Sequence, residues 1–173
     1  MAFVIAQIAG GLASVAAIFY HQQKRKENAL LFNGLMNILA MIQYILLARY
    51  TGALIKFTNI LRNIVLFVLH KKEKKTPLFV TVIVVAATVT GGLIGWDDWF
   101  SLLPILGVSS LTLALCQKNM TIIRCTNIFT LCCWVIYSFA SGAYVGAIGV
   151  SIELISSITS VVRYDLLRKE KKQ

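Results

Sequence analysis

The sequence predicts an all-helical membrane protein, with seven transmembrane helices arranged as two parallel triple-helix bundles and one linker helix. Three observations lead to this fold class: seven apolar stretches, basic residues in alternate connectors, and a repeat that relates the first three stretches to the last three. Each stretch approaches the roughly 20 residues that cross a bilayer core. No segment of the 173 residues is long and polar enough to form a separate soluble domain.

The seven predicted spans follow the uninterrupted apolar sequence. In chain order they cover residues 2–20, 29–48, 53–69, 78–94, 100–115, 121–139 and 144–162. The first stretch lacks a charged n-region and a small-residue cleavage site, so we expect a retained helix rather than a signal peptide.

The basic residues predict the orientation of these spans. Fourteen of the seventeen Lys and Arg residues lie beside the gaps after the first, third and fifth spans or in the tail after the seventh, whereas the intervening gaps hold only Arg49. Cytoplasmic loops accumulate Lys and Arg, which predicts an N-terminus outside and a cytoplasmic C-terminus. Short basic connectors beside membrane spans favour membrane lipid over nucleic acid as a partner.

An offset of 94 residues aligns the first three spans with the last three. It pairs Asn33 with Asn127, and residues 50–53 (Tyr-Thr-Gly-Ala) with residues 144–147 (Tyr-Val-Gly-Ala). The predicted units are a first three-helix repeat at 1–75, a linker helix at 76–95, and a second three-helix repeat with a basic cytoplasmic tail at 96–173. In parallel repeats of this kind the substrate site lies near the midplane, between the two copies.

Polar side chains enter the third and seventh spans on one helical face each. The third span carries Lys56, Asn59, Arg62 and Asn63, and the seventh carries Glu153, Ser156, Ser157 and Ser160. A charge at the bilayer centre costs about 2.5 to 3.5 kcal/mol, so Glu153 is expected to pair with Arg62 or Lys56, or to face water. The predicted substrate-binding residues are Asn59, Arg62, Asn63, Glu153, Ser156 and Ser157.

Two alternatives to a binding site stay open for these faces. The polar groups could form an interhelical clamp, in which a buried ion pair only fixes the register of the helices. Lys56 lies near the outer end of its span and could extend its ammonium group to the interface.

Helix-weakening residues suggest bending points in the first and fifth spans. The 94-residue offset aligns Gly10 and Gly11 with Pro104 and Ile105. Pro removes a backbone hydrogen bond and Gly lowers helix rigidity, so Gly10, Gly11 and Pro104 are predicted hinges. Close helix packing explains the glycines equally well, including Gly142 and Gly146.

The sequence gives no support for a catalytic or metal site. The four cysteines, Cys116, Cys125, Cys132 and Cys133, are expected to be small packing residues. His21 and His70 have no acidic partner nearby in sequence, and the Asp97-Asp98 pair between Trp96 and Trp99 is expected at the outer interface. No phosphate loop, zincin motif or nucleophile elbow is present, so we expect no enzyme activity, no metal and no cofactor.

The segment Arg124-Cys125, followed by residues 132–136 (Cys-Cys-Trp-Val-Ile), Phe139, Gly142 and Gly146, strongly resembles the YgjV family of bacterial inner-membrane proteins. Residues 59–62 (Asn-Ile-Leu-Arg) and 102–107 (Leu-Leu-Pro-Ile-Leu-Gly) are also similar to that family. The resemblance implies the bacterial inner membrane and carries no established substrate.

More remotely, the arrangement of three, one and three helices is similar to the SWEET and PQ-loop (MtN3-like) transporters. That resemblance implies a small-solute carrier, with pocket candidates at Asn59 or Asn63 and at Glu153. The chain departs from the family in having no Pro-Gln pair; its prolines are Pro77 and Pro104.

The predicted function is transport of an unknown small polar solute by alternating access. Asn59, Asn63, Ser156 and Ser157 would hydrogen-bond the solute, while Arg62 and Glu153 would supply charge selectivity or a proton-sensitive ion pair. The alternative is a non-transporting membrane receptor or assembly protein with a SWEET-like fold. The sequence leaves a homo-oligomer open and does not reveal the substrate or the direction of flux.

Overall fold

The computed structural model describes residues 1–22, 26–71, 78–114 and 120–161. These residues form seven α-helices, one 3-10 helix and the loops between them, and no strand is present among them. The helices are α1 (Ala2–Gln22), α2 (Lys26–Leu46), α3 (Tyr50–Lys71), α4 (Leu78–Ile94), η1 (Trp99–Ser101), α5 (Leu102–Ala114), α6 (Met120–Ala140) and α7 (Tyr144–Val161). The prediction of an all-helical chain with seven long helices is confirmed.

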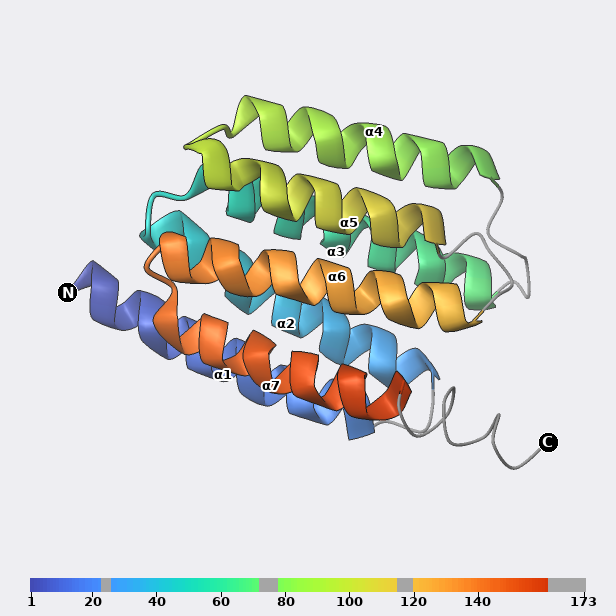
Figure 1. Ribbon diagram of the computed structural model, residues 1–173, viewed down its shortest axis with the longest axis horizontal. Coiled ribbons are helices and arrows are strands. Elements are labelled where there is room, and N and C mark those ends of the chain that lie inside the picture. The colour runs from blue at the N-terminus through green and yellow to red at the C-terminus, as the bar shows by residue number, and fades with distance from the viewer. Residues whose placement is uncertain (23–25, 72–77, 115–119, 162–173) are drawn as a thin grey trace.

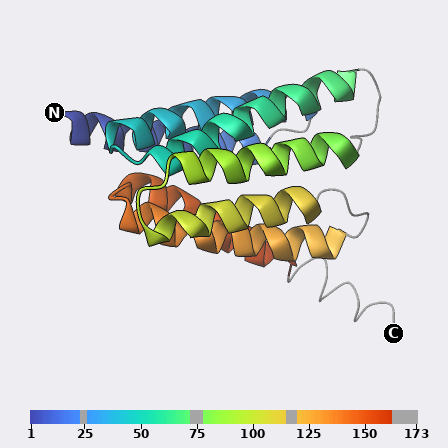
Figure 2. The same cartoon turned by 90° about the horizontal axis from the view of Figure 1, so that it is seen from above.

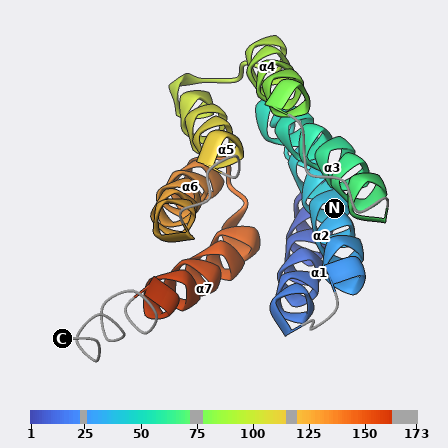
Figure 3. The same ribbon diagram turned by 90° about the vertical axis from the view of Figure 1, so that its right-hand side faces the viewer.

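The helices run side by side along the long axis of the molecule, as Figure 1 shows. Each α-helix packs against the next one in the chain, and α7 packs against α1, which closes the ring. Helix α3 also contacts α5, so α4 lies outside that junction. Figures 2 and 3 show the result as two layers, α1 to α4 on one side and α5 to α7 on the other.

Three described loops lie at one end of the bundle, together with the N-terminus (Figure 1). They are residues 47–49, 95–98 and 141–143, and we call this the tight-turn end. At the opposite end α1, α3, α5 and α7 finish. The sequence that follows α1, α3 and α7 is rich in Lys and Arg, and we call this the basic end.

Two of these loops are built alike. Ala48 and Gly142 both have positive φ, 54° and 76° respectively. In the first turn Arg49 N donates to Tyr44 O at 2.9 Å, and in the second Ala143 N donates to Ser138 O at 2.9 Å. This is the Schellman arrangement at a helix C-terminus. Each residue of the first turn lies 94 positions before its counterpart in the second.

The surface of the bundle is apolar and much of its interior is polar. Large side chains such as Phe79, Ile83 and Ile155 are more than 60% exposed, while Asn37, Gln43 and eleven further polar side chains are buried among the described residues. Two helices, Ala2–Phe19 and Thr121–Ala140, are long and apolar enough to cross a membrane. Shorter apolar helices cover Leu31–Leu46, Phe79–Ile94, Trp99–Ala114 and Tyr144–Thr159. This distribution indicates an apolar environment around the bundle.

Two residues can be compared with their sequence interpretation at the level of the helices. Arg124, which flanks the predicted gap at the edge of the span 121–139, is the fifth residue of α6. Close packing is the wrong explanation for Gly142, because nothing lies within 4 Å of a Cβ at that position and its φ of +76° is what favours glycine.

Candidate binding cavity between the two layers

A cavity of about 940 Å³ lies between the layers. Residues of α1, α2, α3, α5, α6 and α7 line it, and none of the described residues of α4 does. Its volume is within the range of small-molecule sites in proteins. The polar side chains in its wall are Ser14, Asn33, Asn37, Gln43, Tyr44, Lys56, Asn59, Arg62, Asn63, Arg124, Asn127, Thr130, Ser138, Glu153, Ser156 and Ser157.

All six residues predicted to bind substrate lie in this wall. Asn59, Arg62 and Asn63 project from α3, and Glu153, Ser156 and Ser157 project from α7. The sequence therefore located two walls of the cavity, although their binding of a solute stays a prediction. The side chain of Ser160, grouped with them in the sequence, lies outside the described residues.

Amide side chains join neighbouring helices within each layer. Asn63 Nδ2 donates to Asn33 Oδ1, which links α3 to α2. Asn127 Nδ2 donates to Ser157 Oγ at 3.2 Å, which links α6 to α7. Asn127 lies 94 residues after Asn33, and Ser157 lies 94 residues after Asn63. Asn37 Nδ2 also donates to Asn33 Oδ1, at 2.9 Å. At Asn63 and Ser157, part of the polar capacity thus holds helices together, as the clamp interpretation expected.

Lys56 and Arg62 of α3 both face inward. The ammonium nitrogen of Lys56 lies 3.9 Å from the ring centroid of Trp134 on α6, a cation–π distance. Arg62 Nη1 donates a hydrogen bond to Thr112 Oγ1 of α5 at 3.5 Å. Lys56 is therefore directed across the bundle rather than toward the end of its helix. Extension of Lys56 to the interface is not the arrangement in the structure.

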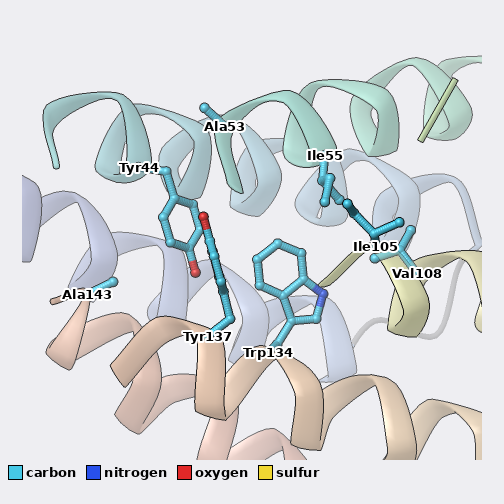
Figure 4. Close-up of a cluster of buried hydrophobic side chains, with 8 residues drawn as sticks. All are labelled: Tyr44, Ala53, Ile55, Ile105, Val108, Trp134, Tyr137 and Ala143. Carbon is cyan, nitrogen blue, oxygen red and sulfur yellow. The ribbon is translucent and has the colours of Figure 1, made fainter. Parts of the chain in front are cut away.

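Aromatic side chains join the two layers at the side of the cavity that faces the tight-turn end. Tyr44 of α2 and Ser138 of α6 join their hydroxyl groups at 2.8 Å. Tyr44 also packs against Trp134 and Tyr137, at centroid distances of 5.9 and 5.6 Å. Figure 4 shows these three rings between the helices, and Gly52 N donates to Tyr137 Oη at 2.9 Å. The layers are thus joined on the side of the cavity that faces the tight-turn end.

Gln43 occupies the same level and lies between two glycines. A Cβ at Gly10 of α1 would lie 2.6 Å from Gln43 Cδ, and one at Gly146 of α7 would lie 2.7 Å from Gln43 Oε1. Real Cβ atoms do not approach other atoms this closely. The side chain is only 2% exposed, and its Nε2 atom has no hydrogen-bond partner in the structure. Close packing therefore explains Gly10 and Gly146.

Polar contacts also close the tight-turn end. Arg49 Nη1 pairs with Asp98 Oδ2 at 2.8 Å. Asp97 Oδ2 accepts from Thr51 N at 3.1 Å, so this carboxylate satisfies an N–H at the start of α3. Gln7 Nε2 donates to Gly142 O at 2.7 Å, joining α1 to the α6–α7 turn. The Asp97-Asp98 pair thus serves contacts within the fold.

The remaining predicted hinge residues have ordinary helix environments. Gly11 lies within α1, and a Cβ there would meet Val145 Cγ1 at 3.5 Å, an ordinary contact. Pro104 is the third residue of α5, where the missing N–H leaves no helical hydrogen bond unmade. Bending at Gly10, Gly11 or Pro104 stays a prediction.

The cysteines and candidate metal ligands add no further site. Cys125, Cys132 and Cys133 are free thiols, and Cys116 lies outside the described residues. The described part of the chain contains no group of three or more His, Cys, Asp or Glu that could hold a metal ion. The side chains of His21 and His70 also lie outside the described residues.

Sequence reasoning missed the contribution of α2 and α6 to the cavity. Asn33, Asn37 and Gln43 line it from α2, and Arg124 and Asn127 line it from α6. The four-residue separation of Asn33 and Asn37 and the three-residue separation of Arg124 and Asn127 place each pair on one side of its helix, which is a signal that the sequence contains. Gln43 is six residues after Asn37 and carries no such signal.

Comparison with known proteins places the chain among inner-membrane proteins. The family described as bacterial inner membrane protein, Imp-YgjV, matches residues 4–168. Inner membrane protein YgjV of Escherichia coli (strain K12) is 26% identical over 171 residues, which are 97% of this chain and 88% of that protein. No solved structure matches the chain. Because the family match spans nearly all of the sequence, the chain belongs to the Imp-YgjV family of bacterial inner membrane proteins.

Proposed function

We propose that this inner-membrane protein carries a small polar solute by alternating access through the cavity between its layers. The observation that best supports this is the cavity of about 940 Å³, which polar and apolar side chains of both layers line and which side chains bridge at the tight-turn end. Polar side chains inside a bundle with an apolar exterior are what a solute path requires.

The topology that goes with this function is seven membrane spans, with the tight-turn end outside and the basic tail in the cytoplasm. Six of the helices have 17 to 22 residues, or about 26 to 33 Å, near the thickness of a bilayer core. The basic sequence beside one end of the bundle supports this orientation. A C-terminal fusion to green fluorescent protein should fluoresce, and a fusion to alkaline phosphatase should be inactive. The reverse pattern would contradict the orientation.

The proposed architecture is two parallel three-helix repeats, SWEET-like, with α4 as the linker. Its support is that contacts recur at an offset of 94 residues, including the two Schellman turns and the Asn33–Asn63 and Asn127–Ser157 pairs. Tyr44 and Ser138 are themselves 94 residues apart and touch each other. Equivalent residues can meet only near the axis that relates two copies, so this pair supports an axis between α2 and α6. Such an axis would lie along the membrane normal.

Alternating access would require the contacts at the tight-turn end to break. The inter-layer contacts there include the Tyr44–Ser138 hydrogen bond, the Arg49–Asp98 ion pair and the bond from Gln7 to Gly142. Helix α4 packs on α3 and α5 outside the cavity, so it could connect the moving halves without blocking the path.

Uptake into proteoliposomes tests the proposal. Purified protein would be tested with labelled sugars, amino acids, organic acids and nucleobases. The variant Asn59→Leu removes a cavity amide and should reduce uptake of the transported solute about tenfold. Thr90→Leu, on the exposed side of α4, is the matched control and should transport normally. If the protein binds a solute but no labelled compound crosses the vesicle membrane, the carrier function is wrong and a receptor is favoured.

A further inference from the structure

The charges in the cavity wall are unequal. Among its described residues, Lys56, Arg62 and Arg124 supply three cations, and Glu153 supplies the one carboxylate. The described side chains of the wall therefore carry a formal net charge of +2. A concave site lined by an excess of one sign of charge attracts ions of the opposite sign.

Lys56 presents its charge at the wall of the cavity. Its ammonium group lies over the indole of Trp134, and both residues line the cavity. The ring is neutral, so it holds the cation in place without cancelling its charge. Asn59 follows Lys56 on the same face of α3, one helical turn nearer the basic end.

Two buried amides in the same wall have unused hydrogen-bonding atoms. Gln43 is 2% exposed and its donor Nε2 has no partner, while Asn59 is 6% exposed and its acceptor Oδ1 has no partner. Buried polar atoms are nearly always hydrogen-bonded, and leaving one unpaired costs about 1 to 3 kcal/mol. A ligand with one acceptor and one donor would satisfy both amides.

We propose that the cavity binds a small solute bearing an oxyanion, carboxylate or phosphate, together with a hydroxyl group. The oxyanion accepts hydrogen bonds from Lys56 and Gln43, and the hydroxyl donates to Asn59. This inference rests on the proposed carrier function and names its class of substrate. It excludes neutral sugars and organic cations as the preferred solutes.

Thermal unfolding of the full-length protein in detergent, measured with four probes, tests this inference. Glycerate and glycerol 3-phosphate carry the two oxyanions, glycerol is the matched neutral compound, and phosphatidylglycerol supplies phosphate in a lipid. A bound ligand raises the melting temperature in proportion to its concentration over its Kd. Stabilisation by glycerate or glycerol 3-phosphate, but not by glycerol, is the expected result. Stabilisation by the lipid alone would overturn the proposal that the ligand is a small solute.

Three variants test which groups provide the selectivity. Lys56→Gln should weaken binding of the oxyanion about tenfold or more, because a charge-assisted hydrogen bond is lost. Lys56→Arg keeps the charge and should bind better than Lys56→Gln. Glu153→Gln removes the carboxylate found among the described residues of the wall and should raise affinity. If the ligand-free melting temperature shows that Lys56→Gln does not fold, Arg124→Gln, which also removes a cavity cation, takes its place.

The outcomes separate the substrate class from the carrier function. Equal stabilisation by glycerol and its anionic analogues, or weaker binding after Glu153→Gln, overturns the oxyanion proposal and leaves transport intact. Oxyanion binding without movement of the same compound into proteoliposomes supports the proposal and contradicts the carrier function. Absence of a shift with all four probes overturns the oxyanion proposal, and uptake of any other solute would still support a carrier.

Discussion

The seam between α1 and α7 should be intolerant of a single methyl group at Gly149. A Cβ at this position would lie 2.6 Å from Ser14 Cβ. The Cβ of Ser14 is fixed to its backbone, so no rotamer change relieves the overlap and the two helices must separate. Overpacking of this kind costs about 1 to 3 kcal/mol. Since alanine is favoured over glycine in a helix by about 1 kcal/mol, the net loss in Gly149→Ala is about 0 to 2 kcal/mol.

Gly34 provides the matched control, because it lies in α2 and nothing is within 4 Å of a Cβ there. Gly34→Ala should show only the gain in helix propensity. The difference between the two variants is therefore the steric cost alone, about 1 to 3 kcal/mol, or roughly 2 to 12 °C in melting temperature for a chain of this size. The melting temperatures would be measured in detergent by tryptophan fluorescence.

The double variant Ser14→Gly/Gly149→Ala decides whether the overlap is the cause. In the Ser14→Gly background the overlapping Cβ is absent, so Gly149→Ala should become as mild as Gly34→Ala. If Gly149→Ala has the same effect in both backgrounds, or is never more harmful than Gly34→Ala, the close contact between α1 and α7 is wrong.

Three further changes test the tight-turn end, each by melting temperature. Tyr44→Phe should cost about 1 kcal/mol by leaving Ser138 without its buried partner, and adding Ser138→Ala should cost little more; additive losses would contradict the hydrogen bond. Asp97→Ala should cost about 0.5 to 2 kcal/mol because N–H groups at the start of α3 lose their acceptor, whereas Asp97→Asn should lose less. Arg49→Gln and Asp98→Asn each remove the ion pair between these two side chains, which are 29% and 33% exposed. Each variant should therefore cost at most about 1 kcal/mol. The double variant should cost no more than either single variant. A double variant twice as destabilised as the singles would show that the two side chains act separately.

The helices were predictable because apolar stretches and their polar interruptions are local in sequence. The stretch at 78–94 coincides with α4, and the others agree with helices to within three residues at either end. Where residues 99–101 form a 3-10 turn, α5 begins only at Leu102, a difference that apolar composition does not signal. Contacts between helices that are far apart in sequence were harder to predict. The contact of Gln43 with Gly146, for example, depends on how α2 and α7 pack.

The cavity shows the same division between local and distant information. Polar faces on α3 and α7 were evident because charged residues in apolar sequence are conspicuous. Arg124 was interpreted only as a cation that flanks the gap after the fifth span, whereas it also lines the cavity from α6. Gln43 is a single amide among apolar residues, and only its position between two glycines makes it distinctive.

The proposed duplication explains both the symmetry of the scaffold and the asymmetry of its cavity. At an offset of 94 residues, Lys56 corresponds to Val150, Arg62 to Ser156 and Asn59 to Glu153. Contacts that hold helices together recur in both halves, but the cations of α3 have no counterpart on α7. A solute between these walls would therefore meet positive charge on α3 and a carboxylate on α7, which favours an orientation with its anionic group against α3. Duplication would supply the frame for movement, and the divergence of these few positions would supply the polarity that selects the solute.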